Sequence, residues 1–165
     1  MYNRAFLELE DAKGAVEAMI EECKKPKYWP HGCFAIVDQG GDLIYFARMD
    51  GAGKLGISMA IRKAYTAAIW AVSTAAFNKM IDARKFRRDP SNYGPDYTTI
   101  PGGVAIIEPA GKDKKFTNPF CIGGIGVSSA GPAELDEAVA KIGLRYIENK
   151  LWPESAHIVP AVEKV

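Results

Sequence analysis

Apolar residues recur along the chain with two different periods, and these periods predict helices and strands. Between residues 9 and 24 they return every three or four positions with acidic residues between them, which predicts an amphipathic helix. Two apolar runs, 33–38 and 43–50, flank Gly40-Gly41 and are rich in β-branched and aromatic residues, which is typical of a β-hairpin. Both faces of these strands are apolar, so we expect helices or another subunit to cover them on both sides.

The second half of the chain continues the alternation. A long helix is expected at about 57–71 and a shorter one at about 75–86. A second hairpin follows, with strands at 104–107 and 120–128, and a last helix begins near Pro132. Strands thus come in antiparallel pairs with helices between the pairs. This order predicts an α+β fold, a small antiparallel β-sheet backed by helices.

The composition is that of an ordinary soluble domain. The 165 residues are 48% hydrophobic and 25% charged with a net charge of +1, which gives no general attraction to nucleic acid or to a membrane surface. No apolar run approaches the roughly 20 residues that span a bilayer, and the start lacks the apolar core of a signal peptide. Three widely spaced cysteines are typical of reduced thiols and form no zinc or redox pattern. We expect one cytoplasmic domain, 1–150, followed by a C-terminal arm, 151–165.

The expected strand at 120–128 carries three glycines. Glycine weakens a strand, because it has no side chain to pack and is costly to order. Three glycines in one strand therefore indicate that another group approaches the backbone closely, or that the strand bends.

Polar side chains gather where the second strand ends. Arg48 and Asp50 lie at a glycine-containing turn, and Lys63 follows on the next helix beside a stripe of alanines. Because a strand end is a rigid support, these two cations and one carboxylate can line a shared hollow that binds an anionic ligand. The alternative is a structural Arg–Asp pair with a solvated lysine.

Three further features carry candidate chemistry. Segment 89–101 is a long irregular loop with Tyr93 and Tyr97, and loops of this length commonly bind or cover ligands. A basic cluster at 84–88 can meet an anionic ligand or a neighbouring subunit, although a solvated surface explains it more simply. His31 is one of two histidines and a candidate metal or haem ligand, although a loop histidine is more often merely exposed.

Five short motifs occur in order along the chain. They are Val37-Asp38-x-x-Gly41, Arg48-Met-Asp50-Gly51, Lys63-Ala-Tyr-Thr66, Pro101-Gly102-Gly103, and Gly126-Val-Ser128 with Asp136 behind it. Together they resemble the GlcG/HbpS-like family, also called the haem-degrading-domain or PduO C-terminal-type family. The resemblance covers residues 9–148. Ser129 stands where the family usually has glycine, and the first helix has no histidine, unlike that of some relatives.

The resemblance implies a profilin- or PAS-like fold that assembles into dimers, tetramers or octamers. It also implies a ligand cleft formed by these motifs, which assigns ligand contacts to Arg48, Lys63, Thr66, Gly102, Gly103 and Ser128. Some members bind haem or other tetrapyrroles, and others belong to pathways for small organic acids, diols or aromatics. Family membership therefore implies the fold better than the chemistry.

Three roles remain open from the sequence, and one of them is a purely structural role in an assembly, in which substitutions in the cleft would have no effect. The other two are functions that use the cleft. The first is an oligomeric small-ligand-binding protein for haem or a similar tetrapyrrole. Arg48, Lys63 or the cluster at 84–88 would meet the propionates, and His31, a methionine, a lysine or a hydroxyl would supply an axial ligand.

The second function is a cofactor-free lyase or isomerase acting on a small aromatic or carboxylated metabolite. Arg48 would orient an anionic group, and Asp50 would tune the pKa of its neighbour. The proton would be moved by Lys63 or by one of the loop tyrosines, Tyr93 and Tyr97, in a pocket lined by aromatic residues that include Phe120. No nucleotide, phosphate-loop or metal-cluster motif appears in the sequence.

Overall fold

The structure, a computed structural model, describes residues 5–83, 94–109 and 120–153. Within these ranges the elements are α1 (Leu9–Cys23), β1 (Cys33–Asp38), β2 (Leu43–Arg48), α2 (Lys54–Trp70), α3 (Thr74–Ala83), β3 (Gly103–Glu108), β4 (Phe120–Ser128) and α4 (Ala133–Leu151). Every predicted helix and strand is present, and α2 begins three residues earlier than expected. The basic cluster at 84–88, Tyr93 and most of the expected arm lie outside the described residues.

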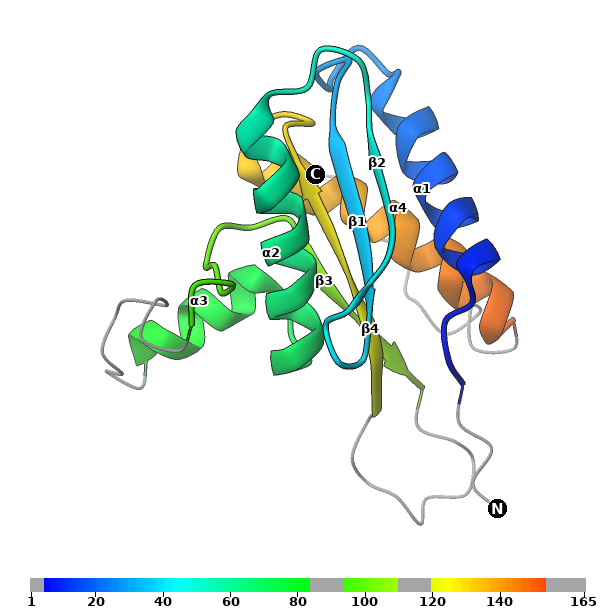
Figure 1. Ribbon diagram of the computed structural model, residues 1–165, viewed down its shortest axis with the longest axis vertical. Helices are drawn as coiled ribbons and strands as arrows, with labels where there is room; N and C mark the ends of the chain where they lie inside the picture. The colour runs from blue at the N-terminus through cyan, green and yellow to red at the C-terminus, as the bar shows by residue number, and fades with distance from the viewer. Residues whose placement is uncertain (1–4, 84–93, 110–119, 154–165) are drawn as a thin grey trace, which may run out of the picture.

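The four strands form one antiparallel sheet in the order β2-β1-β4-β3. Each hairpin supplies two neighbouring strands, and the hairpins join through β1 and β4. Helices α2 and α3 lie on one face of the sheet, while α1 and α4 lie on the other (Figure 1). The α+β prediction is confirmed. No helix in the described part of the chain has the length and apolar character needed to cross a membrane.

Side-chain alternation along β1 divides the core into two layers. Phe34 and Ile36 belong to the larger cluster under α1 and α4, whereas Cys33, Ala35 and Val37 belong to the cluster under α2. All five side chains are fully buried. Helices therefore cover both faces of β1, as its apolar pattern predicts, whereas the edge strand β2 is only partly buried.

The glycines of β4 allow α2 to lie directly on the sheet. A Cβ atom built on Gly126 would lie 1.9 Å from the carbonyl oxygen of Ala60, and one built on Gly124 would lie 2.2 Å from that of Ala64. These distances leave no room for a side chain on either strand position. The close approach indicated by the sequence is thus made by the backbone of α2, whose alanine stripe faces the strand.

On the other face of the sheet, an ion pair joins α1 and α4. At the start of α1, the Glu8 amide donates to Asp11 Oδ2 at 2.9 Å, as part of a capping box. The other oxygen, Asp11 Oδ1, lies 2.6 Å from Lys150 Nζ near the end of α4. Asp11 is buried and Lys150 is exposed, so this ion pair lies at the edge of the α1–α4 interface.

Candidate functional site

Three neighbouring strands bring Arg48, Cys33 and Ser128 into one row across the sheet. Cys33 of β1 is the register partner of Arg48 on β2 and of Ser128 on β4. Residues directly opposite each other in a sheet share a face, and Cys33 faces α2. Arg48 is exposed, whereas Cys33 and Ser128 are buried. The row therefore runs from the solvent-exposed edge of the sheet into its covered centre.

The loops beyond this row bring His31 to the same end of the sheet as the turn after Arg48. The Met49 amide donates to the Gly32 carbonyl at 2.8 Å, which continues the β1–β2 ladder and brings His31 next to the turn that holds Asp50. The half-buried His31 ring stacks on Trp29 with centroids 6.0 Å apart and an interplanar angle of 23°. We call Trp29, His31, Arg48 and Asp50 the Arg48 rim.

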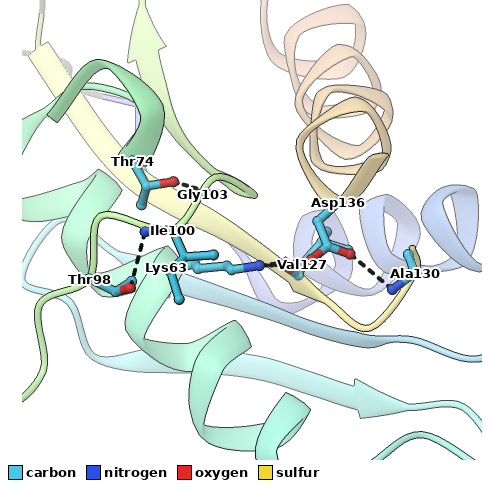
Figure 2. A network of polar contacts seen from close by, with 8 residues as sticks. All are labelled: Lys63, Thr74, Thr98, Ile100, Gly103, Val127, Ala130 and Asp136. Carbon is cyan, nitrogen blue, oxygen red and sulfur yellow. Dashed lines mark hydrogen bonds and ion pairs between the residues drawn. The ribbon is translucent and has the colours of Figure 1, made fainter. Parts of the chain in front are cut away.

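Lys63 lies inside the protein. Its ammonium donates to Asp136 Oδ2 and to the Val127 carbonyl oxygen, both at 2.8 Å (Figure 2). Both side chains of this ion pair are buried. Burial raises the pKa of Asp136, and the Lys63 ammonium acts in the opposite direction. The structure therefore places this ammonium in a closed ion pair, while Arg48 and Asp50 remain exposed.

Two glycines make room for the buried lysine. Gly102 has φ 120°, and a Cβ there would lie 2.8 Å from Lys63 Nζ and 2.7 Å from the Val127 carbonyl oxygen. A Cβ on Gly103 would lie 2.3 Å from the backbone oxygen of Lys63. Both positions, which the family resemblance assigned to a ligand, here pack against α2 and its lysine.

Two threonines fix the chain that leads into β3. Thr66 Oγ1 accepts a hydrogen bond from the Thr98 amide at 3.0 Å, and Thr74 Oγ1 accepts one from the Gly103 amide at 3.0 Å. Both hydroxyls are buried. In this structure Thr66 of α2 holds Thr98, in the segment that leads into β3, by a hydrogen bond.

Tyr97 belongs to an aromatic cluster. Its ring centroid lies 5.4 Å from that of Tyr65 and 6.4 Å from those of Trp70 and Phe77. Burial raises the pKa of the Tyr97 phenol, and a hydrogen bond with Tyr65 adds to the shift. The structure thus places Tyr97 among rings of α2 and α3, and the companion predicted residue Tyr93 lies outside the described residues.

Phe120 lies far from the other predicted ligand contacts. It is the first residue of β4 and Ser128 is the last. Eight residues of strand at about 3.3 Å each separate the two by about 26 Å. Phe120 lines a different hollow of about 360 Å³, together with Phe6 and Asp38. The structure does not bring Phe120 to the Arg48 rim.

A buried thiol and a strained serine meet the first turn of α2. A Cβ on Gly56 would lie 3.0 Å from Cys33 Sγ and 2.6 Å from Ser129 Oγ. Burial raises the pKa of the Cys33 thiol, and the nearby Arg48 charge acts in the opposite direction. Ser129 has φ 70°, the left-handed region that favours glycine. This backbone conformation explains why the family usually has glycine at the position.

Asp136 is the partner of Lys63, and the sequence analysis did not predict this pairing. It is 73 residues from Lys63 along the chain, and the two side chains come from helices on opposite faces of the sheet. Local patterns carry no signal for such a pair. The one available hint was that Asp136 followed the last of the five ordered motifs.

Comparison with known proteins gives consistent matches. A family model described as haem degrading protein HbpS-like matches residues 7–145. A double mutant of Streptomyces reticuli HbpS is 29% identical, with 87% of this chain and 88% of that chain covered and a TM-score of 0.69. A search of curated proteins finds no match.

Two more distant structures share the fold. A PduOC:heme complex is 21% identical over 86% of this chain and 95% of that chain, with a TM-score of 0.70. The protein ORFY from Klebsiella pneumoniae is 20% identical over 90% of this chain and 97% of that chain, with a TM-score of 0.71.

Proposed function

This chain belongs to the HbpS-like family of haem-degrading proteins, and from that premise we propose that it binds haem or a similar flat, acidic tetrapyrrole. A solved relative is described as a haem complex, which supports the choice of ligand. The observation that carries the proposal is the Arg48 rim, which holds an exposed arginine and a half-buried histidine at one end of the sheet.

The rim offers the groups that haem requires. A guanidinium presents paired N–H donors that match a propionate carboxylate, and Arg48 is exposed. The imidazole of His31 can supply an axial nitrogen, and Trp29, which is 51% exposed, offers a flat apolar surface. Among the described residues, no three metal-ligating side chains are grouped. Haem differs from a free ion because it carries its own four equatorial nitrogens and needs only axial atoms from the protein.

The residues have separate tasks in this proposal. Haem would supply the iron, whose chemistry belongs to the cofactor. Arg48 would hold a carboxylate, His31 would offer its nitrogen, and Trp29 would cover part of the ring and exclude water.

The proposal is tested by titrating the purified protein with hemin. We expect a saturable Soret band, and we expect H31A to shift or abolish it because the axial nitrogen is removed. R48A should weaken binding about tenfold, the effect of losing a charge-assisted hydrogen bond. The matched control is H157A, which removes the other histidine and should behave as wild type. A wild-type protein without a saturable Soret band would exclude haem.

We also infer a homo-oligomer. Apolar side chains remain exposed on the edge strand β2, at Leu43, and on α2, at Leu55 and Ile69. Larger exposed apolar surfaces mark contacts with another protein, and these side chains would be covered in an assembly. Light scattering should give a multiple of the 18.0 kDa chain mass, and a mass of one chain at every concentration would contradict this.

The same geometry gives less support to a cofactor-free lyase or isomerase. The Lys63 ammonium is held in an ion pair away from solvent, and burial raises the pKa of Tyr97. Both groups are therefore poorly placed to exchange protons with a small metabolite.

A further inference from the structure

The Lys63–Asp136 ion pair joins helices that lie on opposite faces of the sheet. Lys63 comes from α2 and Asp136 from the first turn of α4 (Figure 2). The lysine reaches past Gly102, where a side chain would collide with its ammonium. This arrangement requires glycine at position 102, just before β3, and it places two charges in the interior. A tight apolar contact would join the helices more simply, since buried ion pairs add little stability over packed apolar groups.

The carboxylate of Asp136 uses its second oxygen for a different bond. Oδ1 accepts the amide N–H of Ala130 at 2.9 Å, while Oδ2 accepts from Lys63. Lys63 also holds the Val127 carbonyl. The pair therefore holds both ends of segment 127–130, which runs from the end of β4 into the connection before α4.

The same connection is hydrogen-bonded to one residue of the Arg48 rim, Trp29. The Trp29 amide donates to the Ala130 carbonyl oxygen at 3.0 Å, and the Trp29 ring stacks on His31. A continuous set of bonds thus leads from Lys63 through Asp136 and Ala130 to the loop that carries the imidazole.

We propose that Lys63 and Asp136 are positioning residues, which fix the 127–130 connection and through it hold Trp29 and His31 in place for the ligand. This inference rests on the proposed function for its ligand. In this proposal neither residue touches the ligand, because both side chains are buried in the interior. The bond that transmits the effect is the one between Asp136 Oδ1 and the Ala130 amide.

Two double variants separate positioning from packing. K63M/D136N removes both charges but keeps a carbonyl oxygen that can accept the Ala130 amide. K63M/D136L removes the charges and the acceptor, with a side chain of similar size. The control is K150M, which breaks the other ion pair to a buried aspartate, Asp11. Amide hydrogen exchange at Trp29 and hemin titration are measured on the full-length protein in each case.

We expect K63M/D136L to exchange the Trp29 amide at least about tenfold faster than wild type, because local opening becomes easier. Its hemin affinity should fall by a similar factor, with an altered Soret position. K63M/D136N should fall between wild type and K63M/D136L in both measurements, because it keeps an acceptor for the Ala130 amide but loses the bonds of Lys63 to Val127 and Asp136. K150M should leave both measurements unchanged. Equal Trp29 protection in the two double variants would overturn the proposal and leave the pair a packing contact.

The exchange measurement does not depend on haem. If wild type binds no hemin, the proposed function fails, while the difference in Trp29 exchange still decides whether the pair positions the rim. If K63M/D136L does not fold, the same comparison is made with K63M/D136A, which also removes both charges and the acceptor, and faster Trp29 exchange than in K63M/D136N is again required.

Discussion

Ser129 holds a backbone conformation that its own chemistry does not favour. Its φ of 70° costs an L-residue about 1 kcal/mol relative to glycine. The flanking bonds explain how the conformation persists, because Lys63 holds Val127 on one side and Asp136 holds Ala130 on the other. A strained residue survives when its surroundings determine its position from several directions.

We predict that S129G raises the free energy of unfolding by up to about 1 kcal/mol. The relief of the left-handed conformation is partly offset by the greater freedom of glycine in the unfolded chain. Urea denaturation measures the change. S128G is the matched control, because Ser128 lies buried in regular β4, and it should lower stability. A destabilised S129G would show that the Ser129 hydroxyl makes a bond worth more than the strain.

At the scale of elements, the glycines of β4 decide how α2 meets the sheet. The helix backbone occupies the space where side chains of Gly124 and Gly126 would stand. Three small residues on the helix, Ala60, Ala64 and Ala68, complete the contact and are buried. The small residues of α2 and the glycines of β4 are therefore both needed for this close contact.

We predict that G126A destabilises the protein by about 3 kcal/mol or more, because the new methyl group would meet backbone atoms that cannot rotate away. Its nearest contacts would be Ala60 O at 1.9 Å and Ala64 N at 2.5 Å. G53A is the control, since nothing lies within 4 Å of a Cβ at Gly53. Thermal and urea unfolding of both variants provide the measurement. A G126A protein as stable as G53A would mean that α2 can move away from the sheet without loss.

The elements were predictable because their signals are local. Strand 120–128 was predicted with the bounds that β4 has, and its glycines indicated a close approach. Which backbone approaches is a question of tertiary packing, and the strand alone holds no answer. For the candidate site, Arg48 and Asp50 share a turn because they are neighbours in sequence. The surroundings of Lys63 depend on how two distant helices meet around the sheet, and no local pattern encodes that meeting.

At the scale of the whole molecule, one ion pair connects the two helical layers across the sheet. Lys63 belongs to the layer of α2, and Asp136 to the layer of α1 and α4. Losing one partner leaves the other as a buried charge, which is far more costly than losing an exposed pair. The stability of each layer is therefore linked to that of the other.

We predict that K63M lowers the free energy of unfolding by about 3–5 kcal/mol, because Asp136 is left charged and unpaired in the interior. K63M/D136L should recover most of this loss. K150M should cost about 1 kcal/mol or less, since Lys150 is exposed and Asp11 keeps the Glu8 amide as a hydrogen-bond donor. Equilibrium unfolding in urea gives all three values. Equal losses in K63M and in the double variant would show that the charge itself is not the source of the cost.

The direct contact between the α2 backbone and the glycines of β4 also limits which positions of this protein can change during evolution. No space remains between α2 and the sheet at Gly124 and Gly126. A ligand could bind there only if the helix moved away from the sheet. If the proposed function holds, the loops around Trp29 and Asp50 lie outside this contact. They could then change in sequence, and with it in ligand preference, while the packing of α2 on β4 stays the same.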